Sequence, residues 1–234
     1  MIPTADDFQA LARSSPWRWT TLHFRHRSAY PGACEAWVRR PGELLVRLPD
    51  GREVRASGLP YTRVMVGSFV PDGSPAAPPP PEPVLPHEAT PAYRPDGLVA
   101  QRPSSFEVGY DDPMYGNYSW VAMLDPVELS HHVEVTNLRE DEVAGRLAWR
   151  ADLRALPGYE PRCGGNCCEL LYSEAGLLAD FESLDQVPEA RRGREYPDHY
   201  DVALDVGTGI VVRCLQVGGA PGAAWLENDV LDVG

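Results

Sequence analysis

The chain has 234 residues, of which 43% are hydrophobic and 24% charged, an ordinary composition for a globular protein that needs neither disulfides nor metals to form its core. Its formal net charge of −13 disfavours nucleic acids and anionic membrane surfaces as partners, because both carry negative charge. The sequence contains no lysine, which excludes lysine Schiff-base chemistry, P-loop nucleotide binding and Ser–Lys catalysis.

The N-terminus carries no mark of an export signal. Met1 is followed by Ile-Pro-Thr-Ala-Asp rather than by basic residues and an apolar run. No window approaches the roughly 18 consecutive apolar residues that a membrane-spanning helix needs. These features predict a cytoplasmic protein without a transmembrane segment.

The first 60 residues predict a short helix followed by strands. Thr4 can cap a helix over 4–12, and Asp6 and Asp7 suit its positive end. Alternating, aromatic-rich runs then predict a series of strands: 17–25, 36–39, 44–48 and 52–55. The turn Pro49-Asp50-Gly51 joins the last two as a hairpin, because proline presets φ and glycine accepts a positive φ.

Residues 71–97 differ in composition, with four consecutive prolines at 78–81. Proline donates no ladder hydrogen bond and favours the polyproline II conformation. Two interpretations stay open: an extended surface connection, or a ligand for a proline-binding module in a regulatory interaction protein. Too few strands precede this segment to form a core alone, so we expect a single domain over 1–234.

The second half begins with another predicted helix. Asp125 serves as its cap, Pro126 occupies its first position and Glu128 its third. The helix is expected to end near His131-His132, where a cation suits the negative end. Period-two patterns then predict three strands: 133–136, 146–154 and 168–172.

The C-terminal segment gives the clearest hairpin of the chain. Strands over 200–206 and 210–217 flank the turn Gly207-Thr208-Gly209. Residues 224–233 would add a closing strand. Sequential hairpins of this kind predict a mainly β fold, an antiparallel meander with one buried face.

The order of motifs in residues 120–217 resembles the LolA/RseB-like lipoprotein-carrier superfamily, in particular its branch in high-G+C bacteria. The resemblance rests on Leu124-Asp125-Pro126 before a strand, on Val143-Ala144-Gly145-Arg146, and on Leu204-Asp205-Val206 leading into Thr208-Gly209-Ile210. It implies a strongly curved antiparallel sheet, an unclosed barrel with short helices plugging its concave face. Residues 15–56 fit as early strands of the same sheet.

The resemblance also implies a non-enzymatic binding protein. Its concave face would hold an apolar ligand, such as an acyl chain, or a hydrophobic segment of a partner protein. We expect these residues to line that face: Trp19, Phe24, Trp37, Trp149, Leu204 and Ile210. The same residues would serve equally well as a packed core.

A second candidate site is the loop Cys163-Gly-Gly-Asn-Cys167-Cys168. Thiolates bind zinc or cuprous copper, so Cys163, Cys167 and Cys168 could hold a metal. A disulfide within the loop, plain buried thiols and a nucleophilic cysteine served by His131, His132 or His199 are the other interpretations. A metal-binding or thiol-redox protein is therefore the alternative function.

The remaining polar residues are expected to be structural. His23 and His26 lie three apart on a strand and therefore face opposite sides. Asp111-Asp112 are expected in a solvated loop, and Asp201 and Asp205 on a solvent-exposed face. The sequence lacks Gly-x-Ser-x-Gly, His-Glu-x-x-His and a dinucleotide-binding glycine motif, so an enzyme is not expected.

Overall fold

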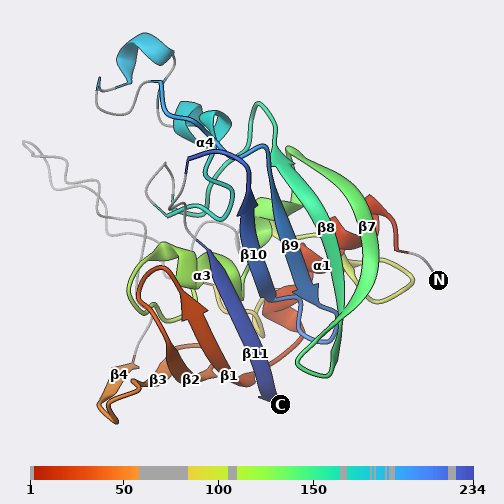
Figure 1. The fold of residues 1–234 in the computed structure, drawn as a ribbon. Helices are drawn as coiled ribbons and strands as arrows, with labels where there is room; N and C mark the ends of the chain where they lie inside the picture. The colour runs from red at the N-terminus through yellow and green to blue at the C-terminus, as the bar shows by residue number, and fades with distance from the viewer. Residues whose placement is uncertain are drawn as a thin grey trace, which may run out of the picture.

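A computed structural model describes residues 3–57, 84–104, 110–163, 168–179, 181, 183–187, 189, 193–220 and 225–234. Its main feature is a nine-stranded antiparallel sheet in the order β4-β3-β2-β1-β11-β10-β9-β8-β7 (Figure 1). The sheet is strongly curved and does not close, because β4 and β7 remain separate edges. The mainly β, unclosed fold expected from the sequence is thus confirmed.

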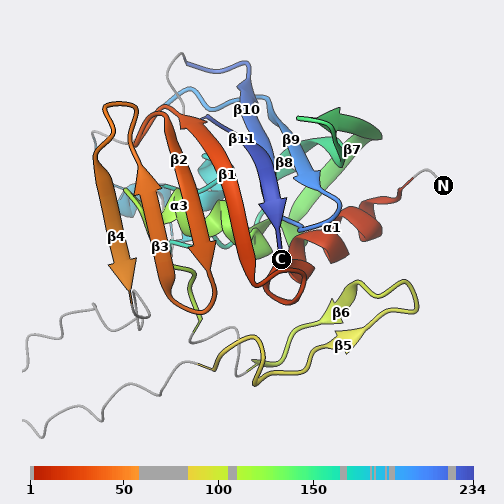
Figure 2. The same ribbon diagram turned by 90° about the horizontal axis from the view of Figure 1, so that it is seen from below.

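The strands of this sheet follow the chain with one long interruption between β4 and β7. Their bounds are β1 Thr21–Ser28, β2 Cys34–Arg39, β3 Glu43–Arg47, β4 Glu53–Ser57, β7 Val133–Val143, β8 Arg146–Ala155, β9 His199–Asp205, β10 Val211–Val217 and β11 Leu226–Val233. A separate two-stranded sheet pairs β5 (Ala92–Tyr93) with β6 (Val99–Gln101). Figure 2 shows this small hairpin beside α1.

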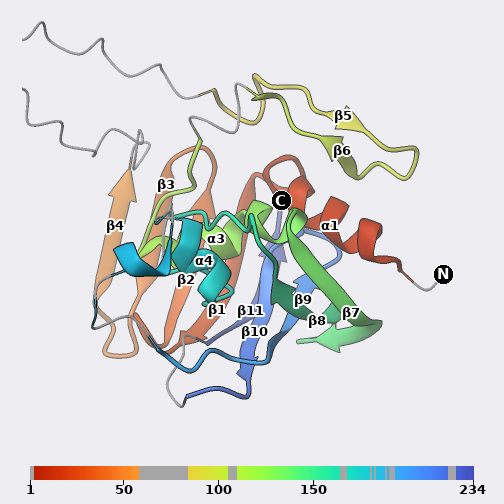
Figure 3. The same cartoon turned by 90° about the horizontal axis from the view of Figure 1, so that it is seen from above.

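Short helices lie on the concave side of the large sheet (Figures 2 and 3). They are α1 (Ala5–Ser14), η1 (Ser15–Trp17), α3 (Tyr118–Leu124), η2 (Val127–Ser130) and α4 (Glu174–Ala179). A further 3-10 helix, η3 (Leu184–Gln186), follows α4 along the chain. The predicted first helix is confirmed with its cap, since Thr4 and Asp7 form a reciprocal capping box. None of the described helices is long and apolar enough to cross a bilayer.

The predicted hairpins are confirmed, and their turns explain why. β3 and β4 pair around the turn at 49–51, and β9 pairs with β10. In the second turn Asp205 Oδ1 accepts from the Thr208 amide at 2.7 Å. Gly209 has φ +76°, and a Cβ there would lie 2.8 Å from the carbonyl oxygen of Leu11. A side chain at 209 would therefore push α1 away from the sheet.

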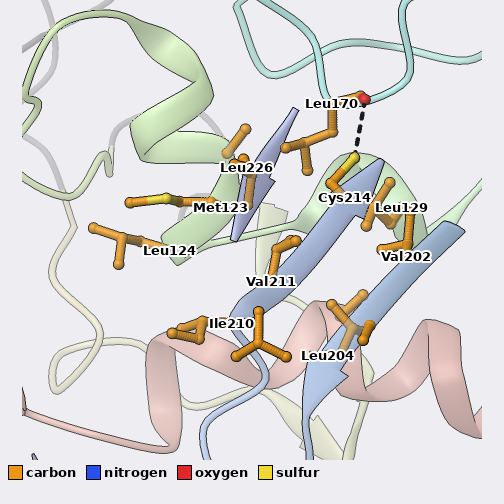
Figure 4. Packing of buried hydrophobic residues seen from close by; sticks show 14 of the residues in the cluster. Met123, Leu124, Leu129, Leu170, Val202, Leu204, Ile210, Val211, Cys214 and Leu226 are labelled. Atoms are coloured by element: carbon orange, nitrogen blue, oxygen red, sulfur yellow. Dashed lines mark hydrogen bonds between the residues drawn. The ribbon is translucent and has the colours of Figure 1, made fainter. Parts of the chain in front are cut away.

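The protein's own side chains fill the concave face. Figure 4 shows Met123 and Leu124 of α3 packed beside Val211 and Ile210, with Leu204 of β9 above α1. All of these residues are buried. Helices and sheet thus form one continuous apolar cluster.

A ladder of ion pairs crosses the convex face from β7 to β1. It runs through Asp141, Arg150, Asp201, Arg213, Glu227 and Arg27, with N···O distances of 2.7, 2.6, 2.8, 3.0 and 3.6 Å. Asp201 and Asp205 were expected on a solvent-exposed face, but their carboxylates are shielded from solvent. Both are buried because long arginine side chains cover them, and Asp205 pairs with Arg146 at 2.7 Å.

A second set of ion pairs lies inside the molecule. Arg40 is bidentate to Asp112, with N···O distances of 2.8 and 2.7 Å, and its guanidinium stacks 3.3 Å above the Trp19 ring. Arg162 binds Asp111 at 2.8 Å. The expected solvated loop at Asp111-Asp112 is therefore wrong, because each carboxylate meets a buried arginine from a distant segment.

Three predicted elements differ from the structure. The strand predicted over 17–25 begins only at Thr21, because residues 15–17 form η1. Asp125 does not cap a following helix: it ends α3, and its carboxylate binds Arg102 and Arg162 instead. Only a 3-10 turn, η2, follows it. Residues 168–172 form no strand, because Glu128 from η2 accepts the amide of Leu170 at 2.7 Å and holds this segment as a loop.

Candidate functional site

A cavity of about 70 Å³ lies at one end of the concave face. It is bounded by the turn after β1, by α3, by residues 169–170 and by the start of β11. Its apolar lining includes Pro31, Trp120, Leu170, Cys214 and Leu226. A single water needs about 10–15 Å³ of such space, so the cavity has room for a small organic group.

Two exposed aromatic residues flank the cavity. Tyr30 is 64% exposed and Trp225 is 39% exposed, and both contribute to the lining. The amide of Ala29 donates to the Trp225 carbonyl at 3.2 Å, which ties the two segments together. Large apolar side chains gathered at a cavity in this way are typical of binding sites.

Three polar side chains form a hydrogen-bonded chain at this cavity, which we name the Ser28–His26–Asn228 triplet. His26 Nε2 lies 2.8 Å from Ser28 Oγ, and His26 Nδ1 lies 2.8 Å from Asn228 Oδ1. His26 and Ser28 both line the cavity. Asn228 is fully buried behind the imidazole.

The buried amide of Asn228 fixes the direction of these hydrogen bonds. Its Nδ2 donates to the carbonyl oxygen of Val211 at 2.7 Å, so Oδ1 is the atom that faces His26. Oδ1 can only accept, and Nδ1 of His26 must therefore carry the proton. Nε2 is left as the acceptor for the Ser28 hydroxyl. Burial lowers the pKa of His26, which keeps the ring neutral.

The surroundings of the triplet are aromatic and partly unsatisfied. The Trp120 ring meets His26 edge-on, with ring centroids 5.2 Å apart. Its indole Nε1 is buried and has no hydrogen-bond partner among the described residues. Trp120 thus brings an unused donor to the region of the cavity.

Glu169 borders the cavity, but its carboxyl group is buried next to α4. A Cβ on Gly176 would come within 3.5 Å of Glu169 Oε1. Neither carboxyl oxygen has a hydrogen-bond partner within the part of the chain that the structure describes. Burial raises the pKa of Glu169 to about 8. The nearby backbone amides of Glu169 and Cys168 partly offset this rise, while Cys163 and Glu128 add to it.

The structure places the six predicted ligand-binding residues in three environments. Trp19, Phe24, Leu204 and Ile210 are buried in the core, and Trp149 is partly buried against it. Trp37 lies on the convex face, where it stacks on His23 with ring centroids 4.5 Å apart. The expected concave position of Trp37 is therefore corrected: its neighbours Ala36 and Val38 are the residues that face inward.

The predicted cysteine site is only partly described. Cys167 lies outside the described residues, while Cys163 and Cys168 are half-buried. No group of three or more possible metal ligands occurs among the residues that the structure describes. Cys34 and Cys214 are buried thiols, and Cys214 Sγ donates to the Leu170 carbonyl at 3.4 Å (Figure 4).

Two of the three triplet residues can be placed on one strand face from the sequence alone. His26 and Ser28 are two apart on a strand, which puts both on one face, and His23 points the other way as predicted. Asn228 is 202 residues away and meets His26 only through the pairing of β1 with β11. That register is a tertiary property, so local patterns do not reveal the third member.

No family model, curated protein or solved structure matches this chain. The LolA/RseB resemblance therefore rests on the sequence motifs alone. The geometry of the cavity and its triplet carries the functional argument.

Proposed function

We propose that the protein binds an uncharged apolar chain, such as a short acyl chain or the end of a longer one, in the cavity at the end of the concave face. The observation that carries this proposal is an apolar cavity of about 70 Å³ flanked by the exposed rings of Tyr30 and Trp225. An uncharged ligand suits a protein with a net charge of −13 better than an anionic one.

The site proposed is smaller than a whole concave face. Leu204, Ile210 and Phe24 pack against the protein's own helices, so a ligand there would have to displace the core. Displacing such side chains costs about 1.5–3 kcal/mol each. The cavity beside Trp120 offers apolar contacts without that cost.

Affinity is expected to rise with chain length until the cavity is full. Each buried methylene group contributes about 0.8 kcal/mol, which corresponds to a roughly fourfold gain in affinity. Calorimetric titration with butanol, hexanol and octanol would measure this slope. An affinity that does not change with chain length would contradict an apolar site.

Blocking the cavity provides the structural test. Ala29 is exposed and lines the cavity, so Ala29→Trp should fill its mouth without disturbing the core. We expect hexanol binding to weaken at least about tenfold. Ala33→Trp is the matched control, because Ala33 is also exposed but does not line this cavity. Equal binding by both variants would place the ligand elsewhere.

A further inference from the structure

The Ser28–His26–Asn228 triplet has the geometry of a nucleophile, a base and an orienting group. We propose that the triplet hydrolyses short-chain esters, with Ser28 as the nucleophile. This proposal rests on the binding of an acyl chain in the cavity proposed above. The two hydrogen bonds that define it are both 2.8 Å long, within the range expected of such groups. The activity goes beyond binding and uses residues that the sequence motifs did not single out.

The tautomer is the first argument for catalysis. A serine hydroxyl is activated only when the facing imidazole nitrogen is unprotonated. Asn228 enforces this state, since its Nδ2 is engaged by Val211 and only Oδ1 can meet Nδ1–H of His26. A neutral asparagine plays the same orienting part in Cys–His–Asn hydrolytic sites.

The position of the serine is the second argument. Ser28 is half-buried at the end of β1 and lines the cavity, whereas Asn228 is fully buried behind the ring. The order from cavity to core is therefore nucleophile, base and orienting group. If the triplet only satisfied buried polar groups, the Ser28 hydroxyl would not need to lie at a cavity.

The reaction balances with water as the only co-reactant. Ser28 Oγ bonds to the ester carbonyl carbon while its proton passes to His26 Nε2. The bond from that carbon to the alcohol oxygen then breaks, and His26 returns the proton to the leaving alcohol. Water attacks the acyl-serine through the same base, releasing the acid and restoring the Ser28 hydroxyl.

The substrate class follows from the cavity and from the third residue. The small apolar space admits a short acyl group, and the net charge of −13 favours an uncharged ester. Asparagine stabilises an imidazolium less than a carboxylate does, so esters with good leaving groups are the expected substrates rather than amides.

A fluorophosphonate probe tests the nucleophile directly. Ser28 Oγ would attack phosphorus, fluoride would leave, and intact-mass analysis with peptide mapping would find one adduct on Ser28. Ser28→Ala should abolish the adduct, and His26→Gln should slow its formation at least about 100-fold. His23→Gln is the matched control, because His23 lies on the same strand but on the convex face. No adduct, or an adduct on another residue, would overturn the proposal.

Turnover and binding are measured separately. Hydrolysis of p-nitrophenyl butyrate by the wild type should exceed that of Ser28→Ala by at least about 100-fold. Equal rates for wild type and Ser28→Ala would overturn the catalytic proposal. If the rates are equal but both the wild type and Ser28→Ala bind hexanol, the binding function still stands. If neither the wild type nor Ser28→Ala binds hexanol, the binding function is refuted as well.

The orienting role of Asn228 is tested by a pH profile. Asn228→Asp keeps an acceptor for Nδ1 but adds a negative charge, which raises the pKa of His26. The acid limb of the rate is expected to move to higher pH. Tyr30, Glu169 and Cys214, the other titratable groups that line the cavity, are present in both proteins. An acid limb that does not move would mean that His26, the residue hydrogen-bonded to position 228, is not the base.

Discussion

Replacing Asp125 with alanine is expected to lower the free energy of unfolding by about 3–5 kcal/mol, the usual cost of leaving buried charges unpaired. Asp125 is fully buried and accepts from two arginines. Arg102 Nη1 lies 3.0 Å from its Oδ2, and Arg162 Nη1 lies 3.1 Å from the same atom. Without the carboxylate, Arg102 loses its bidentate acceptor in a region closed to water.

Urea denaturation followed by circular dichroism would measure this loss. Asp50→Ala is the control, because Asp50 pairs with Arg52 at 2.7 Å on the surface and such pairs contribute about 0–1 kcal/mol. Asp125→Asn should fall between the two, since it keeps an acceptor but removes the charge. Comparable stabilities for Asp125→Ala and Asp50→Ala would mean that water reaches the guanidinium groups.

The buried ion pairs of Asp125 join three segments of the chain. Arg102 follows β6, Asp125 ends α3, and Arg162 lies in the loop after β8. The three segments are far apart in the sequence, yet their charges meet at one buried point. The network therefore holds α3 in place, and α3 carries Trp120 to the cavity.

The strands and the first helix could be predicted from the sequence because their signals are local. Apolar and β-branched residues over 200–206 and 210–217 mark the two strands, and the turn between them needs Gly209. The sequence did not show that β9 is buried on both faces. Thr4 and Asp7 form their capping box within a single turn. Such patterns depend on neighbours within a few residues, so they survive without knowledge of the tertiary fold.

The candidate site could not be predicted because its parts meet through long-range contacts. Asp111-Asp112 look like a solvated loop until Arg40 and Arg162 are placed against them. His26 looks like a core histidine until β11 brings Asn228 beside it. Trp37 looks like a wall residue because alternation gives two faces without saying which one is concave.

Substituting Glu169 with glutamine is expected to stabilise the protein at alkaline pH. Burial raises the pKa of Glu169 from its ordinary 4.5 to about 8, so the folded protein retains a proton that the unfolded chain has released. Between about pH 4.5 and pH 8 the folded protein binds more protons than the unfolded chain, so the free energy of unfolding falls as the pH rises. Each unit of pKa shift corresponds to about 1.4 kcal/mol, so the penalty above pH 8 is on the order of 5 kcal/mol.

Glutamine has the same shape but does not ionise, so Glu169→Gln should match the wild type near about pH 5 and exceed its stability above pH 8. Urea denaturation across this range would measure the difference. Glu128, whose pKa burial raises to about 7, is present in both proteins. The difference between them therefore reports the ionisation of Glu169 together with its repulsion from Glu128. Glu160→Gln is the control, because Glu160 is exposed on a neighbouring loop. The free energy of unfolding could instead depend on pH in the same way for the wild type and Glu169→Gln. That result would mean that water reaches the Glu169 carboxylate in the folded protein, and that the packing between the cavity and α4 opens readily.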